Sequence, residues 1–399
     1  MAPPTEPALV DVDADGDLIL RVGAEFKDDK ASKKKKDGDT NTQATQNKAR
    51  ASEPSKIIRI RVSSKLMTMC SSFFKAMLTG RFREGQIALS ATDPPTIDLP
   101  EDDPDAVLAL CQVLHYKEES YEAQSFPHIL KVALLSDKYD CGRAVKPWFS
   151  HQLLEKRRSG EALSGCDLGQ ALSAAYLLND DQSFLEFSAT AIHFLPQDVD
   201  GTPFGTAILP CLQEELLSSH KSLCNDHMVD FGDALRSALE LAIDDGKEVS
   251  SNGTVKSCNY KGHTIRYGSP CRARATQTGV FVSNLLMAQL WPERWHRTSK
   301  RSFRAAKALA ISLAKEIDKD SDLRCNEAHN CGGSEHSCEK FLEDAFEEEL
   351  IVPGLCLQCV KSSFTSNFVA TRRCEDHERS TCLQAVDELW KFEVDVNHV

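Results

Sequence analysis

Cysteine and histidine residues are concentrated near the C-terminus, where their spacing could hold a metal ion. Seven of the 15 cysteines lie within the last 75 residues. Cys356 and Cys359 are separated by two residues, and Cys374 and His377 repeat this spacing after a stretch of fourteen residues. A two-residue spacer lets both ligands reach one tetrahedral zinc ion, and four protein ligands make a zinc site structural rather than catalytic. The pattern therefore predicts a structural zinc site formed by these four residues.

Two other interpretations of the cysteines remain open. A second set of candidate ligands precedes the first: Cys325, His329, Cys331, His336 and Cys338. Its spacers are longer and less regular, and the sequence does not decide which set would hold the ion. The cysteines also fit reduced thiols that bind no metal, because an intracellular chain keeps its cysteines reduced.

Basic residues in two places could bind phosphate groups. Arg294, Arg297, Arg301 and Arg304 would share one face of a helix that begins near Trp291. The run Lys33–Lys36 matches a nuclear-import signal, but such runs are also typical of solvated loops. The net charge of −13 repels a phosphate backbone over most of the surface. We therefore do not expect nucleic-acid binding, and a nuclear regulatory protein that uses this basic helix is the competing hypothesis.

The sequence contains none of the motifs that mark common catalytic sites. A Walker loop, a dinucleotide-binding glycine pattern, a nucleophile elbow and an H-E-x-x-H helix are all missing from it. Its apolar runs are shorter than the roughly 18 residues of a membrane span, and its N-terminus lacks the pattern of a secretory signal. We expect a non-enzymatic, intracellular chain in the cytoplasm or nucleus, without membrane contact.

The first third of the chain alternates strand patterns with helix patterns. Apolar residues alternate in the strand segments and recur every three or four residues in the helical ones. Ser64 is the expected N-cap of one long helix that ends at Gly80, and Asp103 followed by Pro104 marks the start of another. The expected strands are 18–22, 57–62 and 96–99, and the expected helices are 64–80, 104–114 and 129–140.

These segments resemble the BTB/POZ family, in the form that is common in fungi. The resemblance covers about residues 12–150 and rests on the order of four stretches: Gly16–Val22, Ser71–Leu78, Ile97–Asp103 and Leu114–Tyr116. A later helix that ends in Tyr139 and Asp140 resembles the family's penultimate helix. The resemblance implies an α+β BTB/POZ-like N-terminal domain, a small sheet capped by helices, which binds proteins and has no active site.

The resemblance also implies which residues meet a partner. Cullin-binding members place a hydrophobic residue, any residue and an acid just after the first long helix, and Phe82, Arg83 and Glu84 stand there. In the structural alternative, Phe82 anchors the loop and Glu84 is merely solvated. Asp17 matches a family aspartate, but Ser63 and Ser64 replace the usual histidine and basic residue beside it. The expected function is an adaptor or scaffold, with a cullin-type ubiquitin ligase as partner.

Family members that dimerise tightly exchange an additional N-terminal helix and strand between protomers. About ten residues precede the stretch that resembles the family, which begins near residue 12, and these are too few for such an element. The resemblance therefore implies a weak homodimer, or none, through the N-terminal domain.

A chain of 399 residues is too long for a single hydrophobic core, so we expect several domains. Changes in composition along the chain indicate where their boundaries lie. A mainly α-helical C-terminal region is expected after the BTB/POZ-like domain, with a glycine-punctuated boundary at 246–279. Residues 27–56, which include Lys33–Lys36, contain almost no apolar residues, and this composition predicts a disordered segment. The expected segments are 1–16, disordered; 17–150, BTB/POZ-like, with a disordered insertion at 27–56; 151–250, helical; and 280–399, helical with the Cys/His-rich part.

Overall fold

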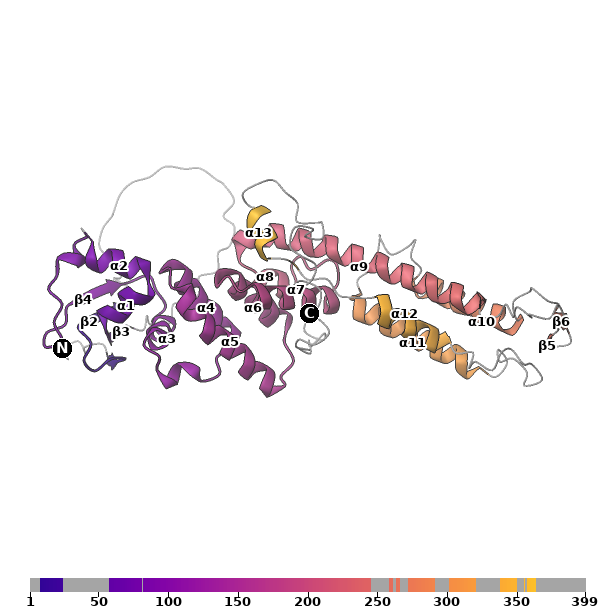
Figure 1. The fold of residues 1–399 in the computed structure, drawn as a ribbon, viewed down its shortest axis with the longest axis horizontal. Helices are drawn as coiled ribbons and strands as arrows, with labels where there is room; N and C mark the ends of the chain where they lie inside the picture. Colours follow the sequence, from indigo (N-terminus) through magenta and orange to yellow (C-terminus); the bar gives the residue numbers. More distant parts are fainter. Residues whose placement is uncertain are drawn as a thin grey trace, which may run out of the picture. The chain divides into compact units, whose positions relative to one another are not determined.

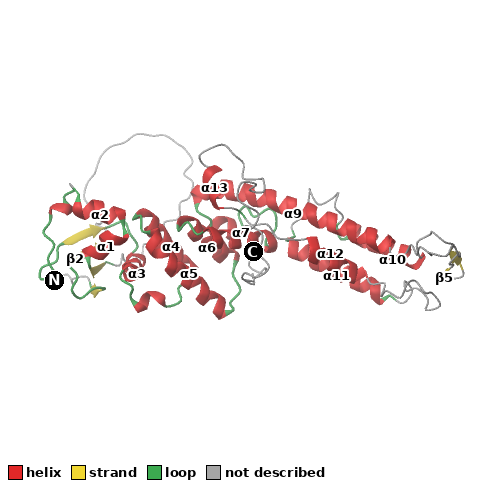
Figure 2. Cartoon of the chain, viewed as in Figure 1, coloured by secondary structure: helices red, strands yellow, loops and turns green. Residues whose placement is uncertain are grey.

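The computed structural model combines a small β-sheet with many helices (Figures 1 and 2). Two compact units divide the chain: unit 1 comprises Met1–Ser159 with Leu177–Asn179, and unit 2 comprises Gly160–Tyr176 with Asp180–Val399. The structure describes residues 8–23, 57–80, 82–244, 258–260, 263–265, 272–290, 301–320, 338–349, 355 and 357–363.

Four strands form the sheet of unit 1, in the order β1-β3-β2-β4. β2 (Leu18–Val22) pairs antiparallel with β3 (Ile58–Val62) and parallel with β4 (Thr96–Leu99). The expected strands 18–22 and 96–99 are confirmed, and the strand expected from Ile57 begins one residue later. Ile58, Ile60 and Val62 are buried and the residues between them are partly exposed, so the predicted alternation is also confirmed.

β1 (Leu9–Asp11) corrects the expectation that residues 1–16 are disordered. It lies at an edge of the sheet, parallel to β3. The backbone N–H of Arg59 donates to the carbonyl of Ala8 at 3.0 Å, and that of Val12 donates to the carbonyl of Arg61 at 3.1 Å. A three-residue strand is too short to show an alternating pattern, so its pairing partner, rather than its own sequence, identifies it.

The helices of unit 1 cover this sheet and continue beyond it. The single helix expected between Ser64 and Gly80 is divided at Ser71 into α1 and α2, and the N-cap of α1 is Ser63 rather than the expected Ser64. The backbone of Ser71 is extended, and its Oγ accepts the N–H of Phe74 at 3.0 Å, which caps α2. The start of α3 at Pro104, with Asp103 as N-cap, is confirmed. The helices are α1 (Ser64–Cys70), α2 (Ser72–Thr79), α3 (Pro104–Leu114), α4 (Phe126–Lys138) and α5 (Gly142–Ser159), with 3-10 turns η1 (Glu84–Gln86) and η2 (Glu118–Tyr121).

The described residues of unit 2 are helical apart from one small hairpin. Its strands are β5 (Cys258–Tyr260) and β6 (His263–Ile265). Its helices are α6 (Gly165–Leu177), α7 (Asp181–Phe194), α8 (Pro203–Ala207), α9 (Pro210–Asp244), α10 (Arg272–Met287), α11 (Phe303–Lys319), α12 (Cys338–Glu349) and α13 (Leu357–Ser363).

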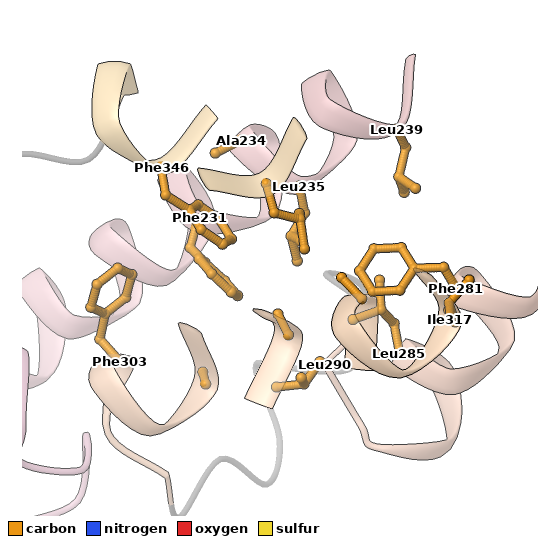
Figure 3. Close-up of a cluster of buried hydrophobic side chains, with 14 residues drawn as sticks. Phe231, Ala234, Leu235, Leu239, Phe281, Leu285, Leu290, Phe303, Ile317 and Phe346 are labelled. Carbon is orange, nitrogen blue, oxygen red and sulfur yellow. The ribbon is translucent and has the colours of Figure 1, made fainter. Parts of the chain in front are cut away.

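One hydrophobic cluster joins four of these helices (Figure 3). Phe231 of α9 packs edge-on against Phe303 of α11, with ring centroids 5.5 Å apart, and stacks on Phe346 of α12 at 4.9 Å. Phe281 and Leu285 of α10 belong to the same cluster. The expected boundary at 246–279 therefore does not separate two helical domains, because helices on both sides of it share this core.

Candidate functional site

The segment Phe82–Glu84 lies between α2 and η1. Phe82 is 61% exposed and Arg83 is also exposed, whereas Glu84 is half-buried at the start of η1. Both interpretations of Phe82 stay predictions, because its ring is largely exposed but also lies close to Gly80 at the end of α2. An exposed aromatic ring followed by an acidic residue is the arrangement that the sequence predicts for a partner contact.

Gly85 holds this segment tightly against the end of α2. The Gly85 N–H donates to the carbonyl of Phe82 at 3.1 Å, and the Gln86 N–H donates to that of Arg83 at 3.2 Å. A Cβ atom at Gly85 would lie 2.7 Å from the carbonyl oxygen of Gly80. Because no side chain fits at that distance, only glycine allows the turn to pass so close to the helix.

Further large apolar side chains are exposed in α2 and in the segment after η1. They are Phe73, Ile87 and Leu89. Together with Phe82 we call these residues the Phe82 surface. Isolated exposed apolar residues are normal on proteins, but several in one stretch of chain are typical of an interaction site.

The start of α2, which carries Phe73, is attached to the junction of α4 and α5. The Ser71 hydroxyl donates to the carbonyl of Tyr139 at 2.5 Å, and the Ser72 hydroxyl donates to the Asp140 carboxylate. The ring of Phe73 meets that of Tyr139 edge-on, with centroids 5.2 Å apart. The exposed Phe73 therefore rests on a buried aromatic residue.

Tyr139 is itself held by a buried carboxylate. Its hydroxyl donates to Asp102, which also pairs with Lys138 at an Nζ–Oδ1 distance of 2.6 Å. Burial, together with the hydrogen bond to Asp102, raises the pKa of Tyr139 above its usual value of 10.0. The phenol therefore stays neutral at physiological pH and keeps its donor role beneath Phe73.

Asp17 lies at the N-terminus of α1. One of its carboxylate oxygens accepts the backbone N–H of Ser64 at 2.8 Å, and the other accepts the Ser64 hydroxyl at 2.7 Å. A carboxylate at a helix N-terminus stabilises the unpaired N–H groups there. We therefore assign Asp17 to the anchoring of α1 rather than to a partner surface, with Ser64 taking the place of the charged neighbour.

His115 lies in the stretch Leu114–Tyr116, and the sequence assigned no role to its side chain. It is 8% exposed at the end of α3, and its Nε2 lies 3.0 Å from the backbone nitrogen of Ser63. Its Nδ1 lies 2.7 Å from the carbonyl oxygen of Cys111. No sequence spacing could have revealed the Ser63 contact, because 52 positions separate the two residues.

Most of the predicted zinc ligands fall outside the described residues. These are Cys356, Cys374 and His377, while Cys359 lies in α13 with its side chain not described. Of the second set, only Cys338 is described; its backbone N–H donates to the Asp318 carboxylate at 3.0 Å. Among the described residues, no three candidate ligands come together to hold a metal ion. The zinc site stays a prediction.

Burial orders part of the segment around Cys356. Leu355, Leu357 and Val360 are buried, and the Leu355 N–H donates to the Ser188 hydroxyl of α7 at 2.7 Å. Apolar contacts to α7 therefore order this part of the segment, so a metal is not needed for that purpose.

The two described members of the predicted arginine stripe, Arg301 and Arg304, do not lie in one helix. α11 begins at Phe303, with Ser302 as its N-cap, so Arg301 precedes the helix. Arg301 donates to the carbonyl of Ala288, and the guanidinium of Arg304 lies over the ring of Phe194 at 4.8 Å. Both arginines thus contact their own chain, and Arg294, Arg297 and Lys33–Lys36 lie outside the described residues. The basic-helix hypothesis stays a prediction.

The chain was compared with protein-family models, curated proteins and solved structures. No protein-family model, no curated protein and no solved structure matches the chain. Within the described parts of the chain, none of the helices is both long and apolar enough to span a membrane.

Proposed function

We propose that this chain is a non-enzymatic adaptor or scaffold whose N-terminal unit is a BTB/POZ-like domain. The observation that carries the proposal is the exposure of Phe82, followed by the half-buried Glu84, at the end of α2. The mixed sheet-and-helix architecture of unit 1 agrees with that class of domain. The proposed partner of the Phe82 surface is the scaffold of a cullin-type ubiquitin ligase, and unit 2 would hold a second protein.

The proposal draws physical support from the way the Phe82 surface is held. Gly85 fixes the turn after Phe82, and the Ser71–Tyr139 contact fixes the start of α2 beneath Phe73. A surface that is ordered before binding loses less conformational entropy when a partner docks. Exposed aromatic side chains at the centre of such a surface supply much of the binding free energy in protein interfaces.

Recovery of a cullin with the tagged full-length chain from cell lysate tests the proposal. Phe82→Ala and Glu84→Lys are each expected to reduce cullin recovery strongly. Leu134→Ala is the matched control, because Leu134 is an exposed apolar residue of unit 1 outside the Phe82 surface. Failure to recover any cullin, or recovery that the two variants leave unchanged, would contradict the proposal.

We further propose that the N-terminal unit forms no exchanged dimer. β1 pairs with β3 of its own chain, so the edge next to β3 is already occupied. Sedimentation of the full chain at low micromolar concentration is expected to show a monomer. The fraction of dimer in the unmodified chain should not exceed the fraction in the Phe82→Ala variant. A concentration-independent dimer that persists when β1 is disrupted by Val10→Pro would show that another surface supplies the contact.

The zinc proposal concerns Cys356, Cys359, Cys374 and His377 only. Elemental analysis of the purified chain is expected to find about one zinc per chain, and the variant Cys374→Ser is expected to lower this value. Cys211→Ser is the control, since Cys211 lies in α9, far along the chain from the Cys/His-rich part. A zinc content near zero in the unmodified chain would rule the site out.

A further inference from the structure

The start of α1 is held by two hydrogen-bond acceptors of different chemistry. The carboxylate of Asp17 accepts from Ser64, and the imidazole of His115 accepts from the backbone N–H of Ser63. Ser63 is the N-cap of α1, and its own carbonyl accepts the N–H of Met67 at 3.1 Å. The two acceptors therefore fix consecutive residues where the helix begins.

The contacts of His115 determine which of its ring nitrogens carries the proton. A backbone N–H can only donate, so Nε2 facing Ser63 must be the unprotonated acceptor. Nδ1 then carries the proton and donates it to the carbonyl of Cys111 at 2.7 Å. The bond to Ser63 thus requires the neutral form of the ring. In the imidazolium form, two N–H groups would face each other across 3.0 Å.

The charged groups around His115 act in opposite directions. Burial is the largest influence and lowers the pKa of His115 below its usual 6.5, whereas the Cys111 carbonyl and the carboxylate of Asp13 raise it. Lys117, which follows α3, lowers the pKa further. Asp17 has both oxygens engaged by Ser64 on the other side of Ser63. The ring is therefore neutral near pH 7 and gains a proton in acid.

We infer that proton binding to His115 releases the start of α1 and makes this helix an acid-sensitive element of unit 1. The Ser63 N–H loses its acceptor, and of the two side-chain acceptors at the start of the helix only Asp17 remains. The start of α2 keeps its own contact between Ser71 and Tyr139, so the release concerns α1. The inference concerns the fold itself and holds whether or not the Phe82 surface binds a cullin.

Hydrogen exchange of the full-length chain, followed by mass spectrometry, tests this inference. Exchange is compared at about pH 7.5 and about pH 5, and each rate is divided by the rate of an unstructured peptide at the same pH. The protection of peptides that cover residues 62–68 is expected to fall by about threefold to tenfold in acid, as the loss of one hydrogen bond predicts. In His115→Gln, which cannot gain a proton, this fall is expected to disappear. His128→Gln is the control: burial lowers the pKa of His128 too, but this residue lies in α4.

An equal loss of protection in His115→Gln and the unmodified chain would overturn the inference, as would unchanged protection in the unmodified chain. A second measurement covers the case in which His115→Gln folds poorly. In the unmodified chain, the NMR signals of the His115 ring and of the Ser63 amide are expected to titrate with one common midpoint below pH 6.5. Different midpoints, or a Ser63 amide signal that does not move, would overturn the inference equally.

Discussion

In unit 1, side-chain hydrogen bonds attach the ends of helices to distant parts of the chain, whereas in unit 2 aromatic rings from different helices pack together. Asp17, His115 and Ser71 each bind an element far away in sequence. Phe231, Phe303 and Phe346 form the centre of the unit 2 cluster. The hydrogen bonds of unit 1 fix where helices begin, and Phe82 is exposed to solvent. The unit 2 cluster buries its aromatic residues between helices.

Truncation of the central aromatic residue is expected to have the largest effect. Phe231→Ala leaves a cavity between two rings and should lower the free energy of unfolding of unit 2 by about 3–5 kcal/mol. Val229→Ala, an exposed position of the same helix, should change it by less than about 0.5 kcal/mol. Urea titration with hydrogen exchange of peptides from each unit would measure both. A loss of stability in unit 1 alone would contradict the placement of Phe231 at the centre of the unit 2 cluster.

Acid should destabilise unit 2 through His193. Burial, followed by the nearby Arg304 and Lys307, lowers the pKa of His193 to about 4. The unfolded chain, with a pKa near 6.5, therefore binds this proton first as the pH falls. The free energy of unfolding of unit 2 therefore keeps its full value above pH 6.5 and falls by up to about 3 kcal/mol as the pH approaches 4. Unfolding of His193→Gln across this range should show a smaller slope with pH, and an unchanged slope would contradict this account.

A polar contact in unit 1 is expected to have a smaller effect. Ser71→Ala removes both the cap of α2 and the bond to the Tyr139 carbonyl, which should cost about 1–2 kcal/mol in the unfolding of unit 1. Ser72→Ala is the matched neighbour, because its hydroxyl meets Asp140 at an exposed position and should contribute less than about 0.5 kcal/mol. Equal effects of the two variants in thermal unfolding would show that the cap does not fix the start of α2.

Features set by local sequence could be predicted, and those set by distant partners could not. The alternation of buried and partly exposed residues in β3 is evident from its spacing, as is the start of α3 at Pro104. The break at Ser71 depends on Tyr139, 68 positions away, and β1 depends on β3. Neither partner can be read from the local pattern.

The candidate site follows the same rule. The place of Phe82 after a helix is evident from the sequence, but the close approach of Gly85 to Gly80 in the turn that follows it is not. The expected arginine stripe extended the helical pattern of α11 backward through Ser302, although a serine with an extended backbone is a strong N-cap. A helical spacing alone therefore does not place Arg301 and Arg304 on one face.

The central claim is that the Phe82 surface binds a cullin scaffold, and the affinity of the purified full-length chain for a purified cullin tests it most directly. Calorimetry is expected to show binding that Phe82→Ala weakens by about tenfold or more, which corresponds to about 1.4 kcal/mol or more. Leu134→Ala should leave the affinity within about twofold. No binding by the unmodified chain, or equal affinity of the Phe82→Ala and Leu134→Ala variants, would contradict the claim.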